Sequence, residues 1–144
     1  MKETAVHITI HSLQYLDTGK ETVTQQADGT LRQTAEGWLL AYREGESSGL
    51  GDTLTTLEIG PDRAVLTRRG ELNSRMVFRP GEPHTSLYET PYGGIPMTLR
   101  ALSLKSDLGE GGGHITIHYQ IKLGGGSAGE TRLRLTVQAK ENTP

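Results

Sequence analysis

The sequence predicts an all-β protein, a single antiparallel up-and-down β-barrel of eight to ten strands that spans residues 1–144. Three observations predict this fold. Apolar and polar residues alternate over many short segments, which is the period of strands with one buried face. Glycine is abundant, at 19 residues, and gathers between these segments. No window shows the 3.6-residue period of a helix, and the short local connections favour a barrel over a Greek-key sandwich.

The bulk composition fits one small domain. The chain has 144 residues, and its hydrophobic fraction of 33% suits strands that keep their second face polar. A net charge of −2 gives no general attraction for nucleic acid or an anionic membrane. Cysteine is absent, which excludes disulfides and thiolate chemistry. Because residues 1–6 lack a signal-peptide pattern and no segment reaches the ~20 apolar residues of a membrane span, we expect a soluble cytoplasmic protein.

The first predicted strand covers residues 3–15. Its apolar residues change parity after Ile10, since Leu13 and Tyr15 are out of phase with the residues before them. This slip near Ser12 predicts either a β-bulge or a strand that changes which face it buries.

The next segment, residues 21–33, is polar and rich in threonine. It predicts one exposed strand, or two short strands that are broken at the turn dipeptide Asp28–Gly29. A strand at residues 38–42 follows, and then a glycine- and serine-rich loop over residues 44–52.

The middle of the chain contains further short strands separated by glycine and proline. A break is expected at residues 80–83, where two prolines flank Gly-Glu, and the apolar phase shifts at Leu102, which predicts a second bulge. The predicted strands are residues 54–59, 63–69, 75–79, 85–90 and 95–104.

The last two strands, residues 115–123 and 132–139, show the clearest alternation. The sequence GGGSAG at residues 124–129 joins them as a hairpin, and we expect the last strand to close the barrel against the first. This loop also fits G-x-G-x-x-G and G-x-S-x-G. Both motifs require a helix after the loop, and a strand follows here, so we reject a dinucleotide site and a nucleophile elbow.

Several of these turn-and-strand patterns together resemble the YwiB-like family of uncharacterised bacterial proteins. The patterns are VLTRRG at 65–70, VFRPG at 77–81, YETPYG at 88–93, LKSDL at 104–108 and the last hairpin. The resemblance covers essentially the whole chain. It implies a closed, calycin-type (lipocalin-like) barrel, and it transfers no catalytic residue. Barrels of that type often hold a small apolar ligand, which is an analogy of fold only.

The pentapeptide HITIH occurs twice, at residues 7–11 and 114–118. Two histidines four residues apart on one strand lie about 13 Å apart, too far to share one metal ion. In a simple meander the last strand separates the two copies. We therefore expect solvent-facing histidines and no metal site.

Five of the ten arginines fall within residues 63–79, opposed there only by Glu71. Arg68 shares the parity of Leu66, so it is expected to point toward the apolar side, where a guanidinium is costly unless it is paired or holds an anion. The functional hypothesis is that Arg68 or Arg69 binds an anionic ligand. The alternative, which we favour, is a solvated basic hairpin or an arginine paired with an acidic residue.

Aromatic side chains complete the candidate ligand site. Tyr88 and Tyr92 flank Pro91 and could line one mouth of the barrel, although structural closure is the favoured role. Trp38, Tyr42 and Tyr119 are expected in the core or in a cavity wall. The candidate ligand-binding residues are Arg68, Arg69, Tyr88, Tyr92 and Trp38.

The leading functional hypothesis is a barrel that binds a small, partly apolar or anionic ligand. The alternative is a structural or interaction module, including a homodimer, without an internal ligand. Enzymatic activity ranks last because no paired acids, triad order or metal spacing is present, and no cofactor is expected. RNA binding through the arginine hairpin is disfavoured because few aromatic residues lie near it.

Overall fold

The computed structural model describes residues 3–16, 19–44, 53–70, 73–124 and 128–140. These residues form ten β-strands, and none of them forms a helix long and apolar enough to cross a membrane. The strands are β1 (Glu3–Leu16), β2 (Gly19–Gln33), β3 (Trp38–Glu44), β4 (Thr53–Ile59), β5 (Ala64–Gly70), β6 (Ser74–Phe78), β7 (His84–Thr90), β8 (Gly93–Ser106), β9 (Gly112–Leu123) and β10 (Ala128–Ala139).

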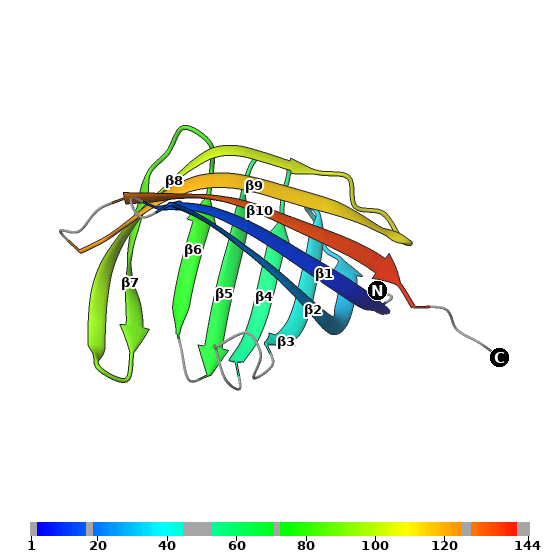
Figure 1. Ribbon diagram of the computed structural model, residues 1–144. Coiled ribbons are helices and arrows are strands. Elements are labelled where there is room, and N and C mark those ends of the chain that lie inside the picture. The colour runs from blue at the N-terminus through cyan, green and yellow to red at the C-terminus, as the bar shows by residue number, and fades with distance from the viewer. Residues whose placement is uncertain (1–2, 17–18, 45–52, 71–72, 125–127, 141–144) are drawn as a thin grey trace.

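All ten strands belong to one antiparallel sheet with the order β6-β5-β4-β3-β2-β1-β10-β9-β8-β7. Every neighbour in this order is a neighbour in the chain, except that β1 pairs with β10. The sheet curls so that its two edges approach each other (Figure 1). The predicted up-and-down meander, the terminal hairpin and its closure against the first strand are confirmed.

The barrel is nearly closed, with a seam between β6 and β7. Among the described residues no ladder joins these two strands, and a side-chain bond crosses the seam, from Ser86 Oγ to the carbonyl oxygen of Arg75 at 3.1 Å. The proline-flanked segment at residues 80–83 turns the chain here through a bond from Glu82 N to Arg79 O. The fully closed barrel implied by the family resemblance is thus corrected to a barrel with one open seam.

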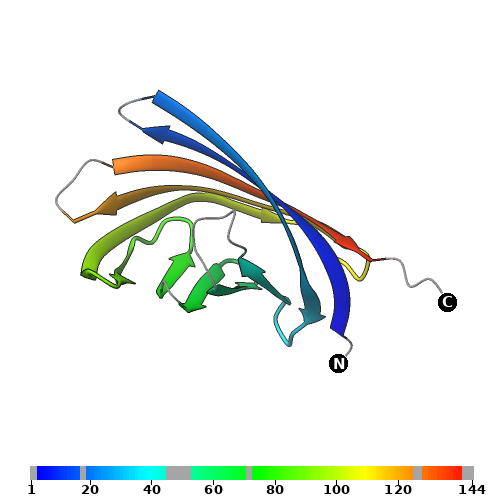
Figure 2. The ribbon, with the colours of Figure 1, turned by 60° about the horizontal axis from the view of Figure 1, so that its bottom comes forward.

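Strand length divides the barrel into two walls. The strands β1, β2, β8, β9 and β10 have 12 to 15 residues, whereas β3 to β7 have five to seven. The long strands curve over the short ones and extend beyond them (Figures 1 and 2). One end of the barrel is therefore overhung by the β1–β2 and β9–β10 hairpins.

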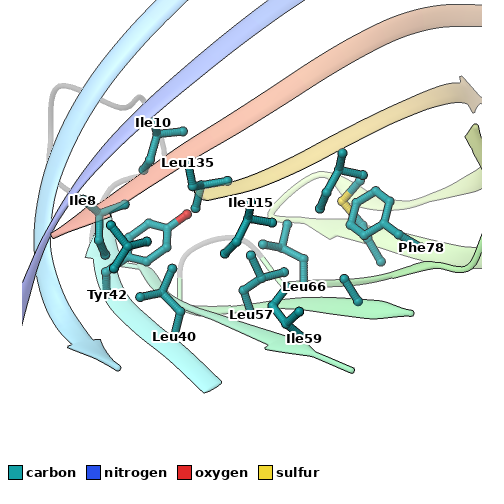
Figure 3. Packing of buried hydrophobic residues seen from close by; sticks show 14 of the residues in the cluster. Ile8, Ile10, Leu40, Tyr42, Leu57, Ile59, Leu66, Phe78, Ile115 and Leu135 are labelled. Atoms are coloured by element: carbon teal, nitrogen blue, oxygen red, sulfur yellow. The ribbon is translucent and has the colours of Figure 1, made fainter. Parts of the chain in front are cut away.

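The core lies between these walls. In Figure 3, Ile8, Ile115 and Leu135 from the long strands face Leu40 and Leu57 from the short strands. Burying one such side chain contributes roughly 1.5–3 kcal/mol, which makes the contact between the walls the main source of stability. The largest side chains that are almost completely buried are Phe78, Ile8, Leu31, Leu40, Leu57, Met97, Leu99, Ile115, Ile117, Leu135, Val6 and Val137.

One of the two predicted bulges is present. The β8–β9 register shifts between Ala101 and Ser103, which confirms the bulge predicted at Leu102. Of the two alternatives predicted near Ser12, the bulge is wrong, because β1 pairs without a shift along both neighbours. Alternation continues regularly through β1, so the polar side chain of Ser12 faces inward and the apolar side chain of Leu13 faces outward.

The segment after β1 is one long strand and is not broken at Asp28–Gly29. A Cβ at Gly29 would collide with the carbonyl oxygen of Ala41 and lie 2.9 Å from the Cβ of Tyr42. Glycine is therefore needed at this position for the close approach of β2 and β3, not for a turn.

Three predicted connections lie wholly or partly outside the described residues. They are the turn at residues 17–19, the loop at residues 44–52 and the glycine-rich loop at residues 124–129.

Candidate functional site

The interior of the barrel is polar at the end that the long hairpins overhang. Four buried polar residues, Thr53, Thr55, Ser74 and Thr131, are found among the described residues. The strand register brings Thr55 and Ser74 to the two sides of Arg68. Buried hydroxyl groups require hydrogen-bond partners, so this end of the interior is chemically distinct from the apolar core.

A pocket of about 360 Å³ opens at this polar end. Six strands contribute hydrophobic and polar side chains to its wall. The lining residues are Ile10, Ser12, Gln14, Glu21, Val23, Gln25, Tyr42, Leu66, Arg68, Tyr119 and Leu133. Ligand pockets in proteins have volumes of roughly 300–1,000 Å³, so this pocket can hold a small molecule.

Arg68 is the basic residue in this pocket wall. It follows Ala64 and Leu66 on the inward face of β5, as its parity predicts, and its Nε atom is buried. Arg69 points to the opposite face and is exposed. Alternation along one strand therefore separates the two candidate arginines, and Arg68 alone of the two faces the interior pocket.

Tyr119 lies across the pocket from Arg68. Burial raises the pKa of the Tyr119 hydroxyl, and the nearby charge of Arg68 and a side-chain hydrogen bond with Thr131 offset only part of this rise. The phenol is thus neutral at physiological pH and can donate or accept a hydrogen bond. Its ring packs against Phe78, with 4.9 Å between the ring centroids, which connects the pocket to the core.

The remaining predicted ligand residues do not gather around Arg68. Trp38 is partly buried at the other end of the barrel, opposite Ile59, whereas Arg68 lies opposite Thr55 on the same strand. Four strand residues correspond to about 13 Å. Tyr92 is 99% exposed at the β7–β8 turn, and its contact with a ligand stays a prediction.

For Tyr88 the structure describes the backbone but not the side chain. The residue lies in β7, and its backbone pairs with that of Ile95 in β8. Its predicted contact with a ligand therefore falls outside what the described residues test.

A second, external pocket of about 330 Å³ meets the first at Arg68. It lies on the β5–β6 hairpin and reaches Leu87 of β7, and it is lined by Thr67, Arg68, Arg69, Asn73, Ser74, Arg75 and Leu87. Arg69 and Arg75 thus flank a surface depression, while Arg79 pairs with Glu82 at 3.1 Å. The predicted arginine cluster is divided among an interior pocket, a surface pocket and an exposed ion pair.

The histidines of the HITIH repeats lie on the outer face of the long strands, separated by β10 as predicted. Each has a neighbour on an adjacent strand or loop. His7 Nδ1 lies 3.2 Å from Asp28 Oδ1, His11 Nδ1 lies 2.9 Å from Thr24 Oγ1, and His118 Nε2 lies 3.4 Å from Glu130 Oε1. Within the described residues, no three histidine or acidic side chains form a group that could hold a metal ion.

The sequence predicts Tyr42 and Tyr119 in the core or in a cavity wall, but it does not predict the polar pocket residues of β1 and β2. Ser12, Gln14 and Gln25 line the pocket from these two strands. A signal for Ser12 and Gln14 was available, because they continue the inward parity of Ile8 and Ile10. Polar residues at inward positions therefore explain the loss of apolar phase by a polar cavity, in place of the predicted bulge or change of buried face.

Comparisons with known proteins support the fold and leave the chemistry open. The crystal structure of the ywiB protein from Bacillus subtilis is similar, with a TM-score of 0.87 and 21% sequence identity over 96% of this chain and 94% of that chain. A comparison with curated proteins gives no match. The family model "Domain of unknown function (DUF1934)" matches residues 8–135. The chain therefore belongs to the DUF1934 family, as its resemblance to YwiB-like proteins predicts.

Proposed function

We propose that this protein binds a small anionic ligand with an apolar portion in the pocket at the polar end of the barrel. The observation that carries the proposal is the position of Arg68, an inward-facing guanidinium in the wall of a pocket of about 360 Å³. A guanidinium binds a carboxylate or phosphate through two parallel hydrogen bonds, and such charge-assisted bonds are roughly twice as strong as bonds between neutral groups.

The other pocket residues support this choice of ligand. Ile10, Val23, Leu66 and Leu133 supply apolar surface for a hydrocarbon segment. The neutral hydroxyl of Tyr119 lies near Arg68 and can donate a hydrogen bond to an anion.

Glu21 also belongs to the pocket wall, on β2. Its carboxylate repels anions, which favours ligands whose apolar part lies on the Glu21 side of the pocket.

A matched ligand series tests the proposal. Purified protein is titrated with straight-chain carboxylates of about four to ten carbons, the size range that such a pocket admits, and with the corresponding amides. Binding is followed by the rise in melting temperature and by calorimetry. We expect saturable binding of carboxylates and much weaker binding of amides.

Two variants identify the anchor. Arg68→Gln should weaken carboxylate binding about 10- to 100-fold, because a hydrogen bond to a charged group contributes about 1.5–3 kcal/mol. The control is Arg69→Gln, which removes the same charge from the next residue on the outer face and should leave binding unchanged. Equal binding by wild type and Arg68→Gln, or no binding by the wild type to any carboxylate, would reject the proposal.

A further inference from the structure

The outer edge of β2 has a long unpaired stretch. β2 pairs with β1 along its length, but with β3 only through residues 29–33. No strand among the described residues pairs with the other side of residues 19–28. Alternate residues of an antiparallel strand direct their N–H and C=O groups to opposite sides, so about half of these ten residues present backbone groups to this open edge.

This edge lacks most of the features by which proteins keep an edge strand from pairing with a strand of another molecule. Residues 19–28 contain no proline, and their register with β1 is regular, without a bulge. Thr22, Val23 and Thr24 give the middle of the segment a high β-propensity. Such an edge is suited to accept another strand.

The sequence of the edge is complementary to itself. When two copies pair in antiparallel orientation about Thr24, Lys20 of each copy lies opposite Asp28 of the other, and Thr22 lies opposite Gln26. A register centred on Val23 instead places Lys20 opposite Gln26, and one centred on Gln25 places Thr22 opposite Asp28. Only the register centred on Thr24 therefore forms the two symmetric ion pairs.

The orientation of the side chains fits the same register. Residues directly opposite each other in an antiparallel pair point to the same face of the sheet. Lys20 and Asp28 are exposed on the outer face of β2, and in the paired copies the outer faces form one continuous surface. The Asp28 side chain already contacts His7 and Lys140, each at 3.2 Å, but it is still 66% exposed and a carboxylate accepts several hydrogen bonds.

We propose that the protein forms a two-fold symmetric homodimer by antiparallel pairing of residues 20–28 of β2 in two copies. The partner is thus a second copy of the same chain. Glu21, Val23 and Gln25 line the interior pocket from this same strand, so the pocket wall of each copy would continue into the partner's β2. The dimer does not depend on the proposed ligand.

Sedimentation of the full chain tests the proposal. One pair of strands is a small interface, so we expect dissociation in the micromolar range, measurable between about 1 and 200 µM. A wild-type protein that stays monomeric over this range would overturn the proposal.

Charge reversal tests the register. Lys20→Glu places two acidic pairs across the interface, and Asp28→Lys places two basic pairs there, so each variant should dimerise about tenfold or more weakly. Mixing the two variants should restore a dimer, because every opposed pair then has opposite charges. The control is Lys105→Glu, which makes the same charge change at an exposed position of β8. This variant should dimerise as the wild type does.

The mixing experiment also separates misfolding from loss of the interface. A variant that does not fold cannot regain a dimer when it is mixed, and circular dichroism of each variant monitors its fold. If neither charge reversal weakens the dimer, or if the mixture remains monomeric, β2 pairing in this register is wrong.

Discussion

At the scale of single residues, position on a strand decides chemistry more than residue type. Arg68 and Arg69 are adjacent and identical, yet one lines the interior pocket and the other is exposed. The same alternation places Ser12 inside and the apolar Leu13 outside. Electrostatic effects on carboxylates also depend on local geometry, as Asp107 illustrates.

Asp107 joins β8 to β9 through two hydrogen bonds with His114. The backbone N–H of His114 donates to its carboxylate, and its own N–H donates to the carbonyl oxygen of His114 at 3.1 Å. The first of these bonds lowers the pKa of Asp107 below its ordinary value of 3.8. A lowered pKa in the folded state stabilises the fold above the unfolded value, and this contribution is lost as the pH falls through the folded-state pKa.

We therefore expect Asp107→Asn to be less stable than the wild type at neutral pH and equally stable once both side chains are uncharged, below the folded-state pKa. Urea unfolding between pH 2 and pH 7 measures the difference. Asp107→Ala, which also removes the acceptor oxygen, should stay less stable at every pH. A gap between wild type and Asp107→Asn that does not change with pH would show that the charge contributes nothing.

At the scale of elements, the sequence was sufficient to predict most of the strands, but not every irregularity and contact within them. Alternation predicted the β9–β10 hairpin, and a phase shift located the bulge at Leu102. The same kind of signal failed in β1, because a polar pocket and a bulge both interrupt an apolar pattern. Asp28–Gly29 looked like a turn, although Gly29 serves the contact between β2 and β3.

Replacement of Gly29 tests this contact. Gly29→Ala adds a methyl group against the backbone of Ala41, which must move, and we expect a loss of about 1–3 kcal/mol in unfolding free energy, as for overpacked cores. The control is Gly94→Ala in β8, where the added Cβ would lie 3.6 Å from Leu87 Cδ2, an ordinary contact. Chemical denaturation of both variants measures the difference. Equal stability of the two variants would contradict a packing role for Gly29.

At the scale of the whole molecule, the candidate site depends on closure of the barrel. Its wall comes from six strands, and pairing of β1 with β10 brings residues near Ile10 and Leu133 together. Alternation along single strands does not predict which residues of different strands come together in the pocket. That grouping depends on strand tilt and on the unequal lengths of the two walls. Arg68 was predictable as an inward charge, whereas the pocket around it was not.

The seam is the second consequence of this architecture. Within the described part of the chain, β6 and β7 each have a ladder partner on one side only, whereas β1, β9 and β10 are paired on both sides. Strands with fewer backbone hydrogen bonds open more readily, so the seam should open more easily than the doubly paired strands. The bond from Ser86 Oγ to Arg75 O is a specific contact that holds its two edges together.

Hydrogen exchange followed by mass spectrometry tests this expectation. Amides in residues 74–78 and 84–87 should exchange faster than those in residues 6–10 and 133–137. Ser86→Ala should increase exchange at the seam about 2- to 10-fold, since one hydrogen bond contributes about 0.5–1.5 kcal/mol, and should leave the central strands unchanged. Thr9→Ala, which removes a hydroxyl from the doubly paired β1, should not affect the seam. Uniform exchange across the sheet, or an equal response of the seam to both variants, would contradict this expectation. The seam would then resist opening as well as strands joined by backbone hydrogen bonds.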